Sequence, residues 1–331
     1  MPSYAHALAV AVFCAGIIQS LWLTFWCVRL KVMPRLHYPR ITSRMKRLFA
    51  LIAPAAMGAG VAQINLFIDL IIASHMAGAV SYLYYADRIN QLPLGIIGVA
   101  IGTALLPMLS KQIKAQHFSQ ALHTQNRAIE LALLFALPAT AALMLLAEPI
   151  VHVLYERGAF TASDTAAVAP ALIAFAVGLP AFILVKVLTP SFYAREDTKT
   201  PFIIATICIV VNVLLCLLLI QFFAHVGMAI ATSVSSWLNV ALIMRYLYRH
   251  GMLKPDMQLC MGGIKMLVAT MLMAAGIWLL LPALQMVLVD AFWLKLGALL
   301  TLCVMAMLAY FIIAWSIKAV DAQLFKQLKQ R

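Results

Sequence analysis

The stretch YYADRINQLPLG, Tyr84–Gly95, places an aspartate, an arginine and a proline inside a long apolar run. Similar apolar runs recur from end to end, and 65% of the 331 residues are hydrophobic. A bilayer core of about 30 Å needs about 20 apolar residues per spanning helix. The sequence therefore predicts an all-α polytopic membrane bundle. It also raises the question of why one membrane helix carries charge in its interior.

Working outward from this stretch, the hydrophobic pattern predicts about nine transmembrane helices. They are expected at 5–28, 48–73, 80–109, 128–150, 166–190, 200–222, 225–247, 260–282 and 292–317. We divide the chain into a first helix (1–29), a basic cytoplasmic linker (30–47), a six-helix lobe of the kind that pairs in transporters (48–250), two additional helices (258–318) and a basic cytoplasmic tail (319–331).

The formal net charge of +13 comes from Lys and Arg that lie mainly in alternate connections between apolar runs. This is the pattern of cytoplasmic loops and not of a nucleic-acid surface, and it places the N-terminus outside and the C-terminus in the cytoplasm. The first residues lack the positive region of a signal peptide, so we expect that earlier helices are missing, with a short N-terminus that crosses unaided as the alternative. The six cysteines have no paired spacing, which argues against a disulfide or metal framework.

One face of the helix around Arg88 is predicted to be polar. Arg88 lies about ten residues inward from Gly78, or roughly 15 Å at about 1.5 Å per residue, which is near the bilayer centre. Helical spacing places Ser81, Tyr84, Tyr85, Arg88 and Gln91 on this face, flanked by Asp87 and Asn90. An arginine at this depth costs about 2.5–3.5 kcal/mol on insertion scales, so it should face protein or a hydrated cavity.

Two interpretations of Arg88 stay open. It could form a buried pair with Asp87 or Asp69 that only fixes helix packing, or it could bind an anion. We favour the anion, because the guanidinium fork matches phosphate or pyrophosphate oxygens and neighbouring residues on a helix point about 100° apart. Lys186 could equally extend toward the cytoplasmic interface or line the same cavity, and Glu130 is expected at the interface.

The same helix carries signals for packing. Pro93 removes a backbone donor and should kink the helix. Gly95, Gly98 and Gly102 then offer a smooth face for close contact with another helix.

A second polar set is expected in the outer half of the membrane. Asp69, Asn212 and Thr232 lie at similar depths in their helices, and their oxygens are the hard ligands that suit Na⁺ or a proton. A chance coincidence of depth also explains the set easily.

Three stretches carry a family resemblance: SYLYYADRINQLPLGIIGVAIGTALLPMLSK (81–111), LYERGAFTASDT (154–165) and KVLTPSFYAREDTKTP (186–201). They resemble the MurJ (MviN) family of lipid II flippases, in the multidrug/oligosaccharidyl-lipid/polysaccharide exporter superfamily. The resemblance implies a two-lobed helical transporter of the bacterial inner membrane. It would move lipid II, an undecaprenyl-pyrophosphate-linked peptidoglycan precursor, from the cytoplasmic to the periplasmic leaflet by alternating access.

The resemblance also implies site residues. Arg88 matches an essential arginine of the family's cationic cavity, and we expect Ser81, Asp87, Gln91 and Lys186 to line the substrate path, although some relatives carry an acid at the position of Gln91. Some members hold Na⁺ where Asp69, Asn212 and Thr232 fall here. Cys216 stands where a further acid would help, so coupling to Na⁺ or a proton stays open.

The chain resembles about nine of the family's fourteen helices, and its last two resemble a pair that forms a groove for the polyprenyl tail. We therefore expect a fragment, or half of a split flippase whose remaining lobe is a separate polypeptide, and no flipping by this chain alone. The alternatives are an exporter of another lipid-linked oligosaccharide or of drugs, and a membrane scaffold that does not transport. An enzyme with a surface metal is disfavoured, because the histidines show no ligand spacing.

Overall fold

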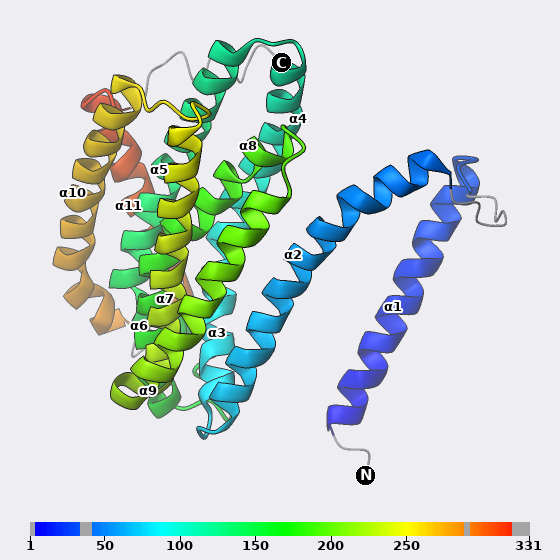
Figure 1. Ribbon diagram of the computed structural model, residues 1–331. Coiled ribbons are helices and arrows are strands. Elements are labelled where there is room, and N and C mark those ends of the chain that lie inside the picture. The colour runs from blue at the N-terminus through cyan, green and yellow to red at the C-terminus, as the bar shows by residue number, and fades with distance from the viewer. Residues whose placement is uncertain (1–3, 34–41, 288–291, 320–331) are drawn as a thin grey trace. The chain divides into compact units, whose positions relative to one another are not determined.

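The computed structural model describes residues 4–33, 42–287 and 292–319, and within these ranges it contains helices and no strand. The predicted all-α fold is confirmed. In chain order the helices are α1 (Tyr4–Arg29), α2 (Ser43–Ser74), α3 (Ala79–Pro93), η1 (Leu94–Val99), α4 (Ala100–Lys114), α5 (Phe118–Leu145), α6 (Ala147–Tyr155), α7 (Ala162–Leu188), α8 (Pro190–Tyr193), α9 (Lys199–Arg249), α10 (Met257–Val287) and α11 (Phe292–Ser316) (Figure 1). Parts of the predicted linker, last external loop and tail, at 34–41, 288–291 and 320–331, lie outside the described residues.

The chain divides into two compact units, residues 1–49 and 50–331. In the first unit, the rings of Trp22 and Trp26 meet edge to face at 5.9 Å near the end of α1. The guanidinium carbon of Arg29 lies 5.3 Å from the centre of the Trp26 ring. A tryptophan beside a basic residue at a helix end is typical of the membrane–water interface.

The second unit is built around α7, which contacts α3, α5 and α9. Between residues 166 and 185 this helix is apolar on every side, which is the pattern of a helix buried among others. Leu172, Leu179 and Ile183 are fully buried. The position of α7 explains why the polar residues of α3 are held on the opposite, exposed face of that helix.

All the predicted membrane spans fall on helices. Within the described ranges, seven helices are long and apolar enough to cross a membrane. One of them, α9, has 51 residues and contains two predicted spans, which meet at non-helical backbone at Ala224 (φ 49°, ψ −134°). The span predicted at 48–73 lies within α2, which is helical from Ser43 to Ser74.

The helix ends on either side of α5 differ from the prediction. Only residues 115–117 separate α4 from α5, so most of the basic connection is helical. Likewise, α6 is helical over Ala147–Tyr155, so the helix includes the first part of the connection expected between residues 150 and 166. Hydropathy marks where a chain leaves the membrane, whereas the backbone hydrogen bonds of a helix continue into the interface.

Pro93 and the glycines that follow it pack against α7. Regular α-helix ends at Pro93 and the π-helical η1 follows, at the place where the proline was predicted to disturb the helix. A Cβ on Gly102 would lie 2.8 Å from the carbonyl oxygen of Lys186, and one on Gly98 would lie 3.5 Å from Lys186 Cγ. The expected close packing holds at these two positions, whereas a Cβ on Gly95 would meet nothing within 4 Å.

The last two helices, α10 and α11, pack against each other at the side of the lobe. In Figure 1, α10 and α11 lie side by side, and α10 also contacts α5. Met266 and Met273 of α10 and Tyr310 of α11 are buried in one cluster, which also includes Leu134 of α5. The predicted additional pair thus packs on the lobe through an apolar cluster that it shares with α5 and α6.

Candidate functional site

The exposed face of α3 carries the predicted polar row. Ser81, Tyr84, Arg88 and Gln91 are exposed, whereas Ala86, Ile89 and Asn90 on the other side are buried. The spacing of three and four residues places the row on one face, as predicted from the sequence. This face can meet water or an anionic ligand.

Tyr85 does not belong to this face, contrary to the prediction. Its ring packs against Tyr155 at 4.7 Å and against Phe160 at 5.3 Å, between ring centres. The sequence placed Tyr85 in the polar row, but Tyr155 at the end of α6 and Phe160 in the connection between α6 and α7 pack against its ring. The motif LYERGAF thus supplies partners that helical periodicity on α3 could not reveal.

Arg88 is held by an aromatic ring. Its guanidinium carbon lies 4.5 Å from the centre of the Tyr84 ring. Among the described residues, Arg88 forms no ion pair. Neither pairing considered from the sequence forms there; Asp87 accepts a hydrogen bond from the Gln91 amide, and Asp69 accepts one from Asn65. The hydrogen-bond donors of Arg88 are therefore available to an anion.

Lys186 lies on α7 beside η1 and α4. Its side chain is exposed while its Cγ lies close to Gly98. Gly98 follows Arg88 by ten residues, or roughly 15 Å along a helix. Both interpretations of Lys186 stay predictions, because an exposed ammonium here can line the path of an anion or extend to the interface.

The structure brings the predicted cation set together through Cys216. Asn212 Nδ2 lies 3.3 Å from Thr232 Oγ1, and Cys216 Sγ lies 3.8 Å from both Asp69 Oδ1 and Asn212 Oδ1. Cys216 and Asn212 are buried. The shared depth predicted for Asp69, Asn212 and Thr232 therefore corresponds to a connected polar cluster between α2 and α9.

This cluster fits a hard cation incompletely. The thiol of Cys216 stands between the carboxylate and amide oxygens, and sulfur is a soft ligand that Na⁺ does not favour. Asn212 also directs its NH₂ group, not its oxygen, at Thr232. We therefore assign no transport step to Na⁺ at this cluster.

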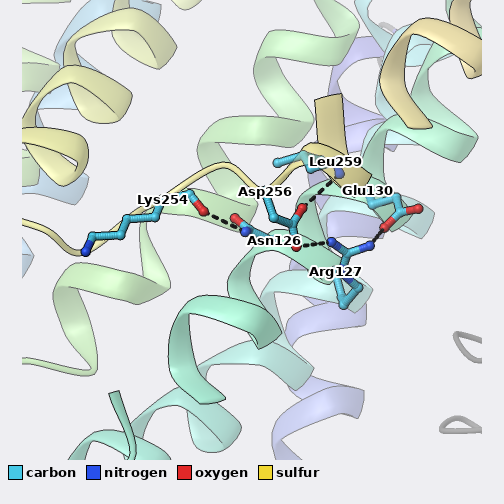
Figure 2. A network of polar contacts seen from close by, with 6 residues as sticks. All are labelled: Asn126, Arg127, Glu130, Lys254, Asp256 and Leu259. Atoms are coloured by element: carbon cyan, nitrogen blue, oxygen red, sulfur yellow. Dashed lines mark hydrogen bonds and ion pairs between the residues drawn. The ribbon is translucent and has the colours of Figure 1, made fainter. Parts of the chain in front are cut away.

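A network around Arg127 is the main polar feature that sequence reasoning missed (Figure 2). Arg127 pairs with Glu130 on the same helix and with Asp256, which directly precedes α10. Asn126 donates a hydrogen bond to the carbonyl oxygen of Lys254. The network joins α5 to the connection between α9 and α10. Glu130, expected at the interface, is only 1% exposed in its side chain.

Asp256 also begins α10. Its Oδ1 accepts a hydrogen bond from Leu259 N–H at 2.8 Å, the contact of a helix N-cap. Burial alone would raise the pKa of Asp256, but this hydrogen bond and the Arg127 guanidinium together hold the pKa below its usual range. The N-cap could have been found in the sequence, since Asp256 precedes an apolar run. Its pairing with Arg127, 129 residues away, could not.

The match to known proteins covers most of the chain. Residues 1–299 match the family described as Lipid II flippase MurJ. A probable lipid II flippase MurJ of Rhizobium tropici is 42% identical over 329 residues, which cover 99% of this chain and 62% of that protein. The corresponding protein of Rhizobium meliloti is 39% identical over 331 residues, covering 98% and 61%.

Solved structures agree with this match. The structure described as lipid II flippase MurJ in an inward closed conformation aligns with a TM-score of 0.69 at 27% identity, covering 88% of this chain and 59% of that one. An outward-facing MATE family multidrug transporter aligns with a TM-score of 0.53 at 15% identity over 80% of this chain, which shows the shared fold alone. This chain spans about three fifths of the length of the two Rhizobium relatives. With a family match over residues 1–299 and seven apolar helices among its described residues, it is a multi-pass membrane protein that belongs to the lipid II flippase MurJ family.

Proposed function

We propose that this chain forms part of a lipid II flippase and supplies one wall of its substrate cavity. The observation that carries the proposal is the exposed face of α3, where Arg88 rests on Tyr84 and pairs with no carboxylate of the described residues. A guanidinium with free donors binds pyrophosphate oxygens in pairs. Relatives in the family are named for lipid II, whose head group is joined to its lipid by pyrophosphate.

In this proposal the chain lies in the bacterial inner membrane with its N-terminus outside and its C-terminus in the cytoplasm. Alternating access would present the face of α3 first to one leaflet and then to the other. Arg88 would hold the anionic head, while Ser81, Asp87, Gln91 and Lys186 line its path. The chain would then act as a transporter and not as an enzyme.

An exporter of another lipid-linked oligosaccharide or of drugs is the alternative within transporters. The unneutralised Arg88 favours an anionic head group over a cationic drug, because organic cations bind to acids. A membrane scaffold that does not transport is the alternative outside them.

Complementation of a strain depleted of its own flippase tests the proposal. The chain is expressed alone and together with the first five helices of a full-length relative, with Arg88 intact or replaced by Ala or Lys. We expect rescue only with the added helices, loss of rescue in Arg88→Ala and partial rescue in Arg88→Lys, which keeps the charge but not the fork. Arg249→Ala is the matched control, because this cation is exposed at the end of α9.

Rescue by Arg88→Ala at the wild-type level would contradict the assigned role of Arg88. Failure of every combination at normal membrane levels would favour the scaffold. The driving ion, Na⁺ or a proton, stays a prediction. Replacing Na⁺ by choline in the same growth assay tests it, and we expect rescue without Na⁺ because Cys216 interrupts the oxygen ligands.

A further inference from the structure

We propose that Tyr84 and Gln91 are positioning residues that keep Arg88 free to bind an anion. Tyr84 would hold the guanidinium, and Gln91 would hold the neighbouring acid, Asp87, away from it. This inference rests on the proposed function, since it concerns the same site. It assigns to two uncharged side chains the task of keeping Arg88 available to an anion.

The first step of the argument is the pairing along α3. Tyr84 and Arg88 are four residues apart, and so are Asp87 and Gln91, which is the spacing at which helical side chains meet. The structure shows both contacts, with Arg88 stacked over the Tyr84 ring and the Gln91 amide donating to the Asp87 carboxylate. Arg88 therefore contacts Tyr84 while Asp87 contacts Gln91, and the arginine and the acid beside it do not pair with each other.

The second step concerns charge. Asp87 is the nearest acid to Arg88 in the chain. Neighbouring residues on a helix point about 100° apart, so the two side chains can pair only if the Asp87 carboxylate leaves its bond with Gln91 and turns toward Arg88. An Asp87–Arg88 pair would occupy the N–H donors of the guanidinium fork and cancel its charge. Few donors and little net charge would then remain to bind an incoming phosphate. An amide at position 91 prevents this by satisfying Asp87 without adding a charge of its own.

The third step concerns direction. A guanidinium stacked on an aromatic ring uses its flat face and leaves its N–H edge free for hydrogen bonds. Tyr84 is 53% exposed, so the stacked pair lies on the open side of α3 and not in the packed core. The Arg88 fork is thus held in place without consuming any of its donors.

Binding of farnesyl pyrophosphate to the full chain in nanodiscs of zwitterionic lipid tests the inference by calorimetry. Gln91→Leu should bind this probe about tenfold more weakly, as expected when a charge-assisted contact is lost. The double variant Gln91→Leu/Asp87→Asn should recover the affinity, because an amide at position 87 cannot neutralise Arg88. A role of Gln91 in folding alone would not produce this recovery.

Tyr84 is tested in the same assay. Tyr84→Leu should weaken binding by roughly two- to fivefold, the worth of an exposed cation–π contact, whereas Tyr84→Phe keeps the ring and should retain most of the affinity. Tyr248→Leu is the matched control, since Tyr248 is 65% exposed at the far end of α9. Equal melting temperatures for all variants show that the bundle is intact.

The outcomes separate this inference from the proposed function. If Arg88→Ala loses the probe but Gln91→Leu and Tyr84→Leu bind like the wild type, the positioning roles are wrong and the role of Arg88 stands. If Gln91→Leu is weak and Asp87→Asn does not restore it, the positioning role of Gln91 is also wrong. If the wild type does not bind, or Arg88→Ala binds equally well, both the inference and the assigned role of Arg88 fail.

Discussion

Replacing Arg127 by Met should be among the most destabilising single changes in the lobe. The Arg127 side chain is 9% exposed and that of its partner Glu130 is 1% exposed, so the variant leaves a buried carboxylate without this cation. Breaking one side of a buried pair costs about 3–5 kcal/mol. We therefore expect Arg127→Met to lower the free energy of unfolding by about 3 kcal/mol or more.

The other partner of Arg127 should matter much less. The Asp256 side chain is 37% exposed, and solvent-exposed ion pairs contribute about 0.2–1 kcal/mol. Asp256→Asn also keeps an oxygen that can accept the Leu259 N–H bond at the start of α10. The structure thus predicts that the two arms of one network differ severalfold in their effect on stability.

Thermal unfolding of the purified chain in detergent measures both effects. A loss of about 3 kcal/mol should lower the melting temperature by about 6 °C or more, whereas Asp256→Asn should change it by about 2 °C. Arg127→Met/Glu130→Met should recover most of the loss, because removing both charges from a buried site is often neutral. Arg249→Met, at an exposed cation, is the control. Equal losses in Arg127→Met and Asp256→Asn, or no recovery in the double variant, would refute the reasoning.

Two further predictions concern packing and pH. A Cβ on Gly227 would lie 2.5 Å from the carbonyl oxygen of Leu219, so Gly227→Ala should cost about 1–3 kcal/mol in the unfolding assay, while Gly276→Ala, where nothing lies within 4 Å, should be neutral or stabilising. Burial alone would raise the pKa of Glu156, but hydrogen bonds from Thr165 and His152 hold the pKa below its usual range. A carboxyl group whose pKa is lower in the folded than in the unfolded protein stabilises the fold at pH values above its ordinary pKa. This stability is lost as the pH falls toward the folded-state pKa. Melting temperatures between pH 7 and pH 3 should therefore fall less steeply in Glu156→Gln, and parallel curves would contradict this.

The helices, their membrane spans and the polar face of α3 follow from the sequence, because each depends on local periodicity. Apolar length predicts a span wherever it falls, and the three- and four-residue spacing of Ser81, Arg88 and Gln91 places them on one face in any helix. The same reasoning predicts that Asp69 and Asn212 lie at a similar depth in the membrane, because this depth is counted in residues from the ends of each helix.

Other features depend on which helices meet, and only the tertiary structure decides them. Tyr85 turns inward because Tyr155 and Phe160 lie beside it, and Gly102 packs closely against Lys186 of α7 whereas Gly95 is exposed. The Arg127–Asp256 pair joins residues 129 positions apart. Periodicity along one helix shows which way a side chain faces, whereas the partner on that side is chosen by packing between helices distant in sequence.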